Sequence, residues 1–271
     1  MQGIKLILED SYKGCGHSKG LARGLQLFWD GENMTQEGMG IGTIAIKEND
    51  CTYFSQRCEN LKNGGEIARR RFFLDTILLT GPKGMETSLL TRIRDRGMEF
   101  YKKHPKTQRI QLSADRFLRR VFHIRRTFKR IKPKAEAIIS YEVLENEVLI
   151  TFNISIKDFS LPKICLMNEL GADWFDGSMI EGEAAKPPSA WQSMSAEADD
   201  QRMPSFYSAK LGLCFSISDI YIKDNFSYEL FWGREKTREL CWAGYTIEIE
   251  VRDKTIKWVT GSYKIILTEA N

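Results

Sequence analysis

Apolar and polar residues alternate strictly in several short segments, and the cleanest alternation covers residues 148–156. The apolar side of this segment consists of Val148, Ile150, Phe152, Ile154 and Ile156. A period of two is that of a β-strand with one buried face. The preceding residues 135–144 are also β-rich, and Glu145-Asn146-Glu147 has turn composition, so the sequence predicts a hairpin here.

A second alternating segment spans residues 240–251. Tyr245, Ile247, Ile249 and Val251 lie on one side of it, and the other side carries Thr246, Glu248 and Glu250. This pattern predicts a strand with one buried face and one face in water.

Other β-rich runs recur along the chain and are bounded by turn residues. They cover residues 4–8, 25–29, 43–47, 51–55, 163–169, 210–216, 219–222, 227–232 and 262–268. Residues 47–50, Lys-Glu-Asn-Asp, have the composition of a hairpin turn between two of these runs. No helix-then-strand rhythm accompanies them, which argues against a doubly wound parallel sheet. The sequence therefore predicts a mainly β protein, a large antiparallel β-sandwich or barrel, in a single domain over residues 1–271.

One or two helices are expected as an insert at about residues 86–132. Within it, an apolar stripe steps by four, three, four and three residues through Phe117, Val121, Ile124, Phe128 and Ile131. This spacing favours one helical face, although 124–128 also suits an extended chain. A two-domain alternative would place its boundary near residues 81–84.

Charge is distributed unevenly. Residues 66–134 hold 20 basic and six acidic residues, a net charge of +14, while the rest of the chain carries −10 and the whole chain +4. Such asymmetry indicates an anionic partner, or a basic segment that packs against acidic parts of its own fold.

The arginines of this basic segment are the candidates for contact with a polyanion, because a guanidinium pairs with phosphate through two hydrogen bonds. The candidates are Arg116, Arg119, Arg120, Arg125, Arg126 and Arg130. On a helix they would lie beside the apolar stripe. The alternative functional hypothesis is therefore a non-catalytic protein that binds nucleic acid or another phosphorylated partner through residues 66–134.

Two long connections, residues 30–42 and 171–191, carry carboxylates, and the second also carries two tryptophans. Sugar-processing sites need two carboxylates, one acting as acid and one as base or nucleophile, and they commonly include aromatic rings that stack on the sugar. The candidate catalytic residues are Glu169, Asp173, Asp176, Glu32 and Glu37. The candidate ligand-binding residues are Trp174, Trp191 and Asp30. The favoured hypothesis is a carbohydrate- or sugar-derivative-binding or processing protein with an acidic cleft between these loops.

The sequence contains no complete motif for binding a metal or a cofactor, and neither group is expected. Cys15 and His17 would be two ligands at most, and the glycines between Gly38 and Gly42 precede a strand instead of a helix. The first ten residues lack the features of a signal peptide, and no run of about 20 apolar residues occurs, so a cytoplasmic protein without a membrane partner is expected. Cys165, Cys214 and Cys241 lie in apolar runs and are expected to be reduced core thiols.

Overall fold

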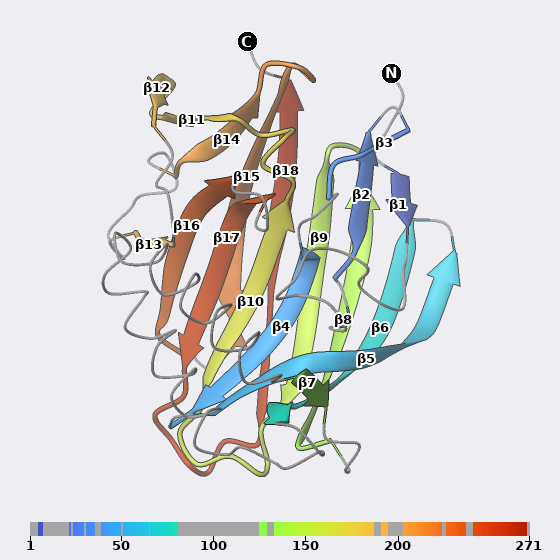
Figure 1. Ribbon diagram of the computed structural model, residues 1–271, viewed down its shortest axis with the longest axis vertical. Helices are drawn as coiled ribbons and strands as arrows, with labels where there is room; N and C mark the ends of the chain where they lie inside the picture. The colour runs from blue at the N-terminus through green and yellow to red at the C-terminus, as the bar shows by residue number, and fades with distance from the viewer. Residues whose placement is uncertain are drawn as a thin grey trace.

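Antiparallel strands make up most of the described structure (Figure 1). The computed structural model describes residues 5–7, 22, 24–29, 31–35, 39–49, 51–64, 66–80, 125–128, 133–186, 191–194, 203–223, 226–236 and 241–269. These ranges contain no α-helix, and therefore no helix of the length and apolarity needed to cross a bilayer.

The strands fall into two sets. A small sheet has the order β1-β2-β3, with β1 (Lys5–Ile7), β2 (Gln26–Trp29) and β3 (Glu32–Asn33). The strands of the large sheet are β4 (Gly40–Glu48), β5 (Cys51–Gly64), β6 (Ile67–Thr80), β7 (Arg125–Phe128), β8 (Ala135–Leu144), β9 (Glu147–Ser155), β10 (Lys163–Leu170), β11 (Gly177–Ile180), β12 (Glu183–Ala185), β13 (Gln192–Ser193), β14 (Ser205–Ser208), β15 (Leu213–Ile222), β16 (Tyr228–Lys236), β17 (Cys241–Glu250) and β18 (Trp258–Glu269).

The large sheet has 15 strands in the order β12-β11-β14-β15-β18-β9-β8-β6-β5-β4-β10-β17-β16-β13, and β7 pairs with β6 outside this path. Its two end strands, β12 and β13, have three and two residues and do not pair with each other, so the sheet is open. The prediction of a mainly β, antiparallel fold is confirmed. A closed barrel, one of the two arrangements expected, is not formed.

The two predicted hairpins are present. Strands β8 and β9 pair from Ala137↔Ile154 to Leu144↔Glu147, and the two-residue turn between them places Glu145 at a φ of 50°. Strands β4 and β5 pair up to Glu48↔Cys51, with Asn49 at a φ of 51°. Positive φ at a non-glycine residue is tolerated mainly in tight turns of this kind.

The predicted helices at about residues 86–132 can be compared with the structure only at residues 125–128. Residues 81–124 and 129–132 lie outside the described residues, so most of the helix prediction is not tested. Residues 125–128, however, form strand β7, and they pair with Ile77–Thr80 of β6. The helical prediction is wrong for these four residues, because the backbone of β6 offers them a partner that the spacing of apolar residues does not reveal.

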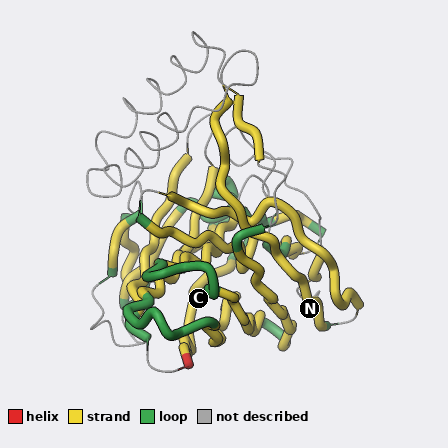
Figure 2. The backbone as a smooth tube through the Cα atoms, turned by 90° about the horizontal axis from the view of Figure 1, so that it is seen from below, coloured by secondary structure: helices red, strands yellow, loops and turns green. Residues whose placement is uncertain are grey.

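The sheet curls over its own interior (Figure 2). Side chains from strands that are distant in the sheet order meet inside the curl. Tyr263 of β18 donates a hydrogen bond to Asn168 Oδ1 of β10 at 2.9 Å, and Tyr141 of β8 donates one to the Gly42 carbonyl of β4 at 3.3 Å. All four residues are buried, and burial raises the pKa of both tyrosines. Apolar residues from both sides of the curl fill the rest of the interior.

The outward face differs between the two sides of the curl. We call β8, β9 and β18 the open half, because their outward residues reach solvent; in β9 buried and more exposed residues alternate as predicted. We call β4, β10 and β17 the covered half, because most of their outward residues are buried as well.

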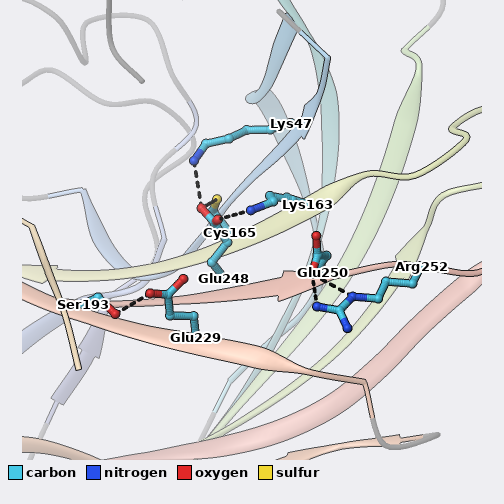
Figure 3. Close-up of polar contacts among 8 residues, drawn as sticks. All are labelled: Lys47, Lys163, Cys165, Ser193, Glu229, Glu248, Glu250 and Arg252. Atoms are coloured by element: carbon cyan, nitrogen blue, oxygen red, sulfur yellow. Dashed lines mark hydrogen bonds and ion pairs between the residues drawn. The ribbon is translucent and has the colours of Figure 1, made fainter. Parts of the chain in front are cut away.

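The predicted wet face of residues 240–251 falls in this covered half and is wrong at two positions. Thr246 is 5 % and Glu248 7 % exposed. Glu248 tolerates this burial because it accepts hydrogen bonds from two lysines, Lys47 at 2.9 Å and Lys163 at 3.2 Å (Figure 3). A buried carboxylate is stable only with such partners.

Candidate functional site

Strand β10 carries Glu169 at an irregularity of the sheet. The register between β10 and β4 shifts between Met167 and Glu169, which is the signature of a β-bulge. Asn168 lies beside the bulge and points inward, where its Oδ1 accepts hydrogen bonds from the Gly42 N–H at 3.0 Å and the Tyr263 hydroxyl at 2.9 Å. Glu169, the next residue along the strand, lies on the outward face. The extra residue of the bulge belongs to β4, between Gly40 and Thr43, whereas β10 keeps an unbroken register with β17. Bulges are frequent beside active sites.

Glycines flank Glu169 on both neighbouring strands. Gly40 of β4 and Gly244 of β17 are its register partners, and Gly233 of β16 lies opposite Gly244. A Cβ on Gly244 would lie 1.9 Å from the Asn168 carbonyl oxygen, so only glycine allows this close approach of β10 and β17. Among the residues in register across β4, β10, β17 and β16, Glu169 is therefore the only one that has a side chain.

The surroundings of Glu169 favour its protonated form. The residue is 8 % exposed, and burial raises the pKa of its carboxyl group to about 7. The nearby carboxylate of Glu235 also raises this pKa, and a hydrogen bond from the Met39 N–H to Oε2 at 3.1 Å opposes the shift. A group with a pKa near 7 can both give and take a proton at neutral pH, as a general acid and base must.

Glu235 comes from β16 and is itself 7 % exposed. It lies directly opposite Trp242 of β17, and the ring of Trp191 stacks on that of Trp242 with centroids 4.2 Å apart and planes 17° from parallel. Trp191 is half-buried. The site therefore combines two buried carboxylates with a pair of stacked indoles next to Glu235.

The loops expected to build the cleft do approach each other. The Gly171 N–H donates to the Met34 carbonyl at 2.8 Å, and the Met39–Glu169 hydrogen bond makes a second link. Arg234 fixes the start of the 171–191 loop, donating to the Phe175 and Ala172 carbonyls, both at 2.9 Å.

The other predicted carboxylates do not join Glu169 in contacts that the structure describes. Asp173 is exposed and forms an ion pair with Lys236 at 2.6 Å, and the hydrogen bond from Lys236 lowers the pKa of Asp173. Asp176 and Glu32 are exposed, the latter in β3. Asp30 and Glu37 lie outside the described residues.

The two tryptophans of the 171–191 loop play different parts. Trp174 is 8 % exposed and belongs to the hydrophobic core, and Lys210 places its ammonium group 3.9 Å from the ring centroid. Little of its ring is exposed, and its role as a ligand-binding residue stays a prediction. Trp191, by contrast, lies on the outward face beside Trp242.

Sequence reasoning did not identify Glu235 or Trp242. The signal that points to Glu169, an acidic residue near the end of an apolar strand, is also present at Glu235. What the sequence does not show is that β10, β17 and β16 are neighbours, which brings the ends of the two strands to the same place.

A second cluster of polar side chains lies further along the outward face of the covered half (Figure 3). Glu248 accepts hydrogen bonds from Lys47 and Lys163, and the Cys165 thiol donates to its Oε2 at 3.5 Å. Cys165, Cys214 and Cys241 are buried free thiols, as expected. The described residues contain no group of three or more His, Cys, Asp or Glu side chains that could hold a metal ion.

The basic segment is described only at its ends. Arg116, Arg119, Arg120 and Arg130 lie outside the described residues, and for Arg125 and Arg126 only the backbone in β7 is described. Three of the remaining basic residues have partners within the protein. Arg70 is fully buried and donates to the Gly24 carbonyl at 3.2 Å, Arg71 lies 3.9 Å from Glu59, and Lys134 lies 3.1 Å from Glu48. Binding of a polyanion by this segment stays a prediction.

Comparison with known proteins adds little to this geometry. No family model matches the sequence, and no curated protein is significantly similar to it. Among solved structures, the Slr1438 protein from Synechocystis sp. PCC 6803 aligns over 98 % of this chain and 78 % of its own, with 8 % sequence identity and a TM-score of 0.37. A similarity at this level says nothing about function.

Proposed function

We propose that the protein binds and processes a saccharide or sugar derivative, with Glu169 and Glu235 as the reacting carboxylates. Trp191, which is half-buried and stacks on the buried Trp242 next to Glu235, would provide the aromatic surface against which a sugar ring packs. The observation that carries this proposal is the burial of two carboxylates close enough to interact, Glu169 and Glu235, which raises the pKa of Glu169 to about 7.

Cleavage of a glycosidic bond requires this kind of asymmetry between two acids. One carboxyl group must be protonated at working pH so that it can give its proton to the leaving oxygen, and the other must be ionised to act as base or nucleophile. Two carboxylates that share a low-dielectric site separate their pKa values, because both cannot ionise at low cost. Glu169 takes the role of acid in this scheme, and Glu235 supplies the second carboxylate.

The proposal is tested with a panel of chromogenic glycosides and of free glycans, assayed for hydrolysis and for binding. Glu169→Gln and Glu235→Gln should each lower kcat/KM at least about 100-fold, because removal of a general acid or base costs factors of about 10² to 10⁴. Asp176→Asn is the matched control, since this exposed acid lies on the adjoining loop and should leave the activity unchanged.

Wild-type activity in Glu169→Gln would overturn the assignment of the acid. Failure of every glycan to bind at millimolar concentration would overturn the proposal as a whole.

A further inference from the structure

The outward face of the open half continues onto β15 on one side and onto β6 and β5 on the other. The register across these six strands aligns one outward residue from each. The row reads Tyr221, Ser262, Thr151, Ser140, Arg69 and Lys62. All six side chains are exposed or half-buried, so the row is a continuous part of the surface. We call it the hydroxyl row.

One end of the hydroxyl row is cationic. Arg69 and Lys62 lie directly opposite each other on β6 and β5, both are exposed, and neither has an ion pair among the described residues. Like charges placed directly opposite across a sheet repel each other. An anion bound between them would relieve this repulsion. Ser140 of β8 lies next to Arg69, and its hydroxyl group would give the anion a further hydrogen bond.

The middle of the row is uncharged. Ser262, Thr151 and Ser140 offer hydroxyl groups, and the row on one side of them, Thr260, Asn153 and Ile138, is uncharged too. The row on the other side contains Lys264 and Glu142, and Lys264 is already paired with Glu147 and Asp219. At the far end Tyr221 presents a ring that is 62 % exposed. With strands about 4.8 Å apart, the row from Tyr221 to Arg69 spans about 19 Å.

This distribution of charge selects among extended ligands. A nucleic acid carries a phosphate at every residue and calls for cations along the whole path. Here the cations stand at one end only, followed by side chains that hydrogen-bond to hydroxyl groups and by an aromatic ring at the other end. These features match an oligosaccharide with a single negatively charged sugar at one terminus.

We propose that the hydroxyl row binds such an acidic oligosaccharide, with the charged sugar between Arg69 and Lys62 and a neutral sugar against Tyr221. The row shares no residue with the site around Glu169. It is therefore a second site, which stands or falls independently of the function proposed for Glu169 and Glu235.

Calorimetry with three probes tests the inference: a tetrasaccharide that ends in one uronate, its fully neutral counterpart and a single-stranded oligothymidylate of eight nucleotides. The uronate probe should bind at least about tenfold more tightly than the neutral one, because hydrogen bonds to a charged group are stronger than those to a neutral group. The double variant Lys62→Gln, Arg69→Gln should remove this preference, and Thr151→Val should weaken both tetrasaccharides.

Two controls separate this site from other effects. Lys254→Gln removes an exposed lysine from a distant turn and should change nothing, and Glu169→Gln should leave binding of the uronate probe intact. An unchanged preference for the uronate probe in the double variant overturns the proposal. So does tighter binding of the oligothymidylate than of the uronate probe.

Discussion

The inward side chains are buried in both the covered and the open half of the sheet, whereas the outward side chains differ in their exposure. In β8, β9 and β18 the outward side chains face solvent and have few partners, whereas in β4, β10 and β17 most of them are buried. Polar residues in the covered half must therefore be matched one by one, as Glu248 is by two lysines. Glu169 is matched less completely, because it accepts one hydrogen bond, from the Met39 N–H, and burial raises the pKa of its carboxyl group. This incomplete matching is the basis of the role proposed for Glu169.

The largest expected difference between the halves comes from two asparagines. Asn168→Ala leaves two buried donors, the Gly42 N–H and the Tyr263 hydroxyl, without their acceptor. Each loss costs about 1 to 2 kcal/mol, so we expect a destabilisation of about 2 to 4 kcal/mol in urea unfolding. Asn153→Ala, on the exposed face of β9, should change the stability by less than about 0.5 kcal/mol. Equal effects would erase the distinction between the halves.

Glu169 should give the next effect, in the dependence of stability on pH. Its pKa rises from 4.5 to about 7 on folding, so the folded state holds more protons than the unfolded state between these values. Stability should therefore fall as pH rises from about 4.5 to 7 and then level off, by up to about 3 kcal/mol.

Unfolding curves at several pH values measure this slope. Glu169→Gln should remove it and should be more stable than the wild type at pH 8. Glu136→Gln, an exposed acid of β8, should leave the slope in place. A wild-type slope in Glu169→Gln would show that another group titrates.

Glu248 tests whether polar matching stabilises the covered half. Glu248→Gln keeps the shape of the side chain but leaves Lys47 and Lys163 facing a neutral amide, which should cost about 1 to 2 kcal/mol. The same change at an exposed acid of the open half should lower the stability by less than about 0.5 kcal/mol. Thermal unfolding of Glu248→Gln beside Glu136→Gln makes the comparison, and a cost no greater than that of Glu136→Gln would contradict it.

The smallest effect is expected at Asp173, whose ion pair with Lys236 is exposed. Asp173→Asn should cost no more than about 0.5 kcal/mol, because exposed pairs are weak and salt screens them. Any difference measured at low salt should disappear at 1 M salt. A cost above about 1 kcal/mol that survives salt would mean that the loop after β10 contributes more to stability than its exposure implies.

Local patterns in the sequence predicted the local parts of this fold. The alternation in β9 and the turns at Glu145 and Asn49 depend on neighbouring residues only, and they were predicted correctly. Residues 240–251 carry an equally clean alternation, but whether Thr246 and Glu248 meet water depends on what packs over β17. The period of two cannot encode that. Strand β7 was mistaken for helix for the same reason, because its partner β6 lies about 50 residues earlier in the chain.

The candidate site shows the same division. Glu169 could be predicted because an acid at the end of an apolar strand is unusual wherever the strand lies. Its partner Glu235 could not be chosen among many acids without the order β10-β17-β16. Asp173 and Trp174 are neighbours in sequence but lie in different environments, Asp173 in an exposed ion pair and Trp174 in the core.

An open sheet normally offers its two margins to a further chain, which can add as another strand and begin a fibre. Here the outermost strands, β12 and β13, have only three and two residues. An added strand would gain few backbone hydrogen bonds at either of them, and the side chains of β13 are exposed and polar. Growth of the sheet at β12 or β13 would therefore add little hydrogen bonding, and the margin left for a further strand is the part of β16 that β13 does not cover.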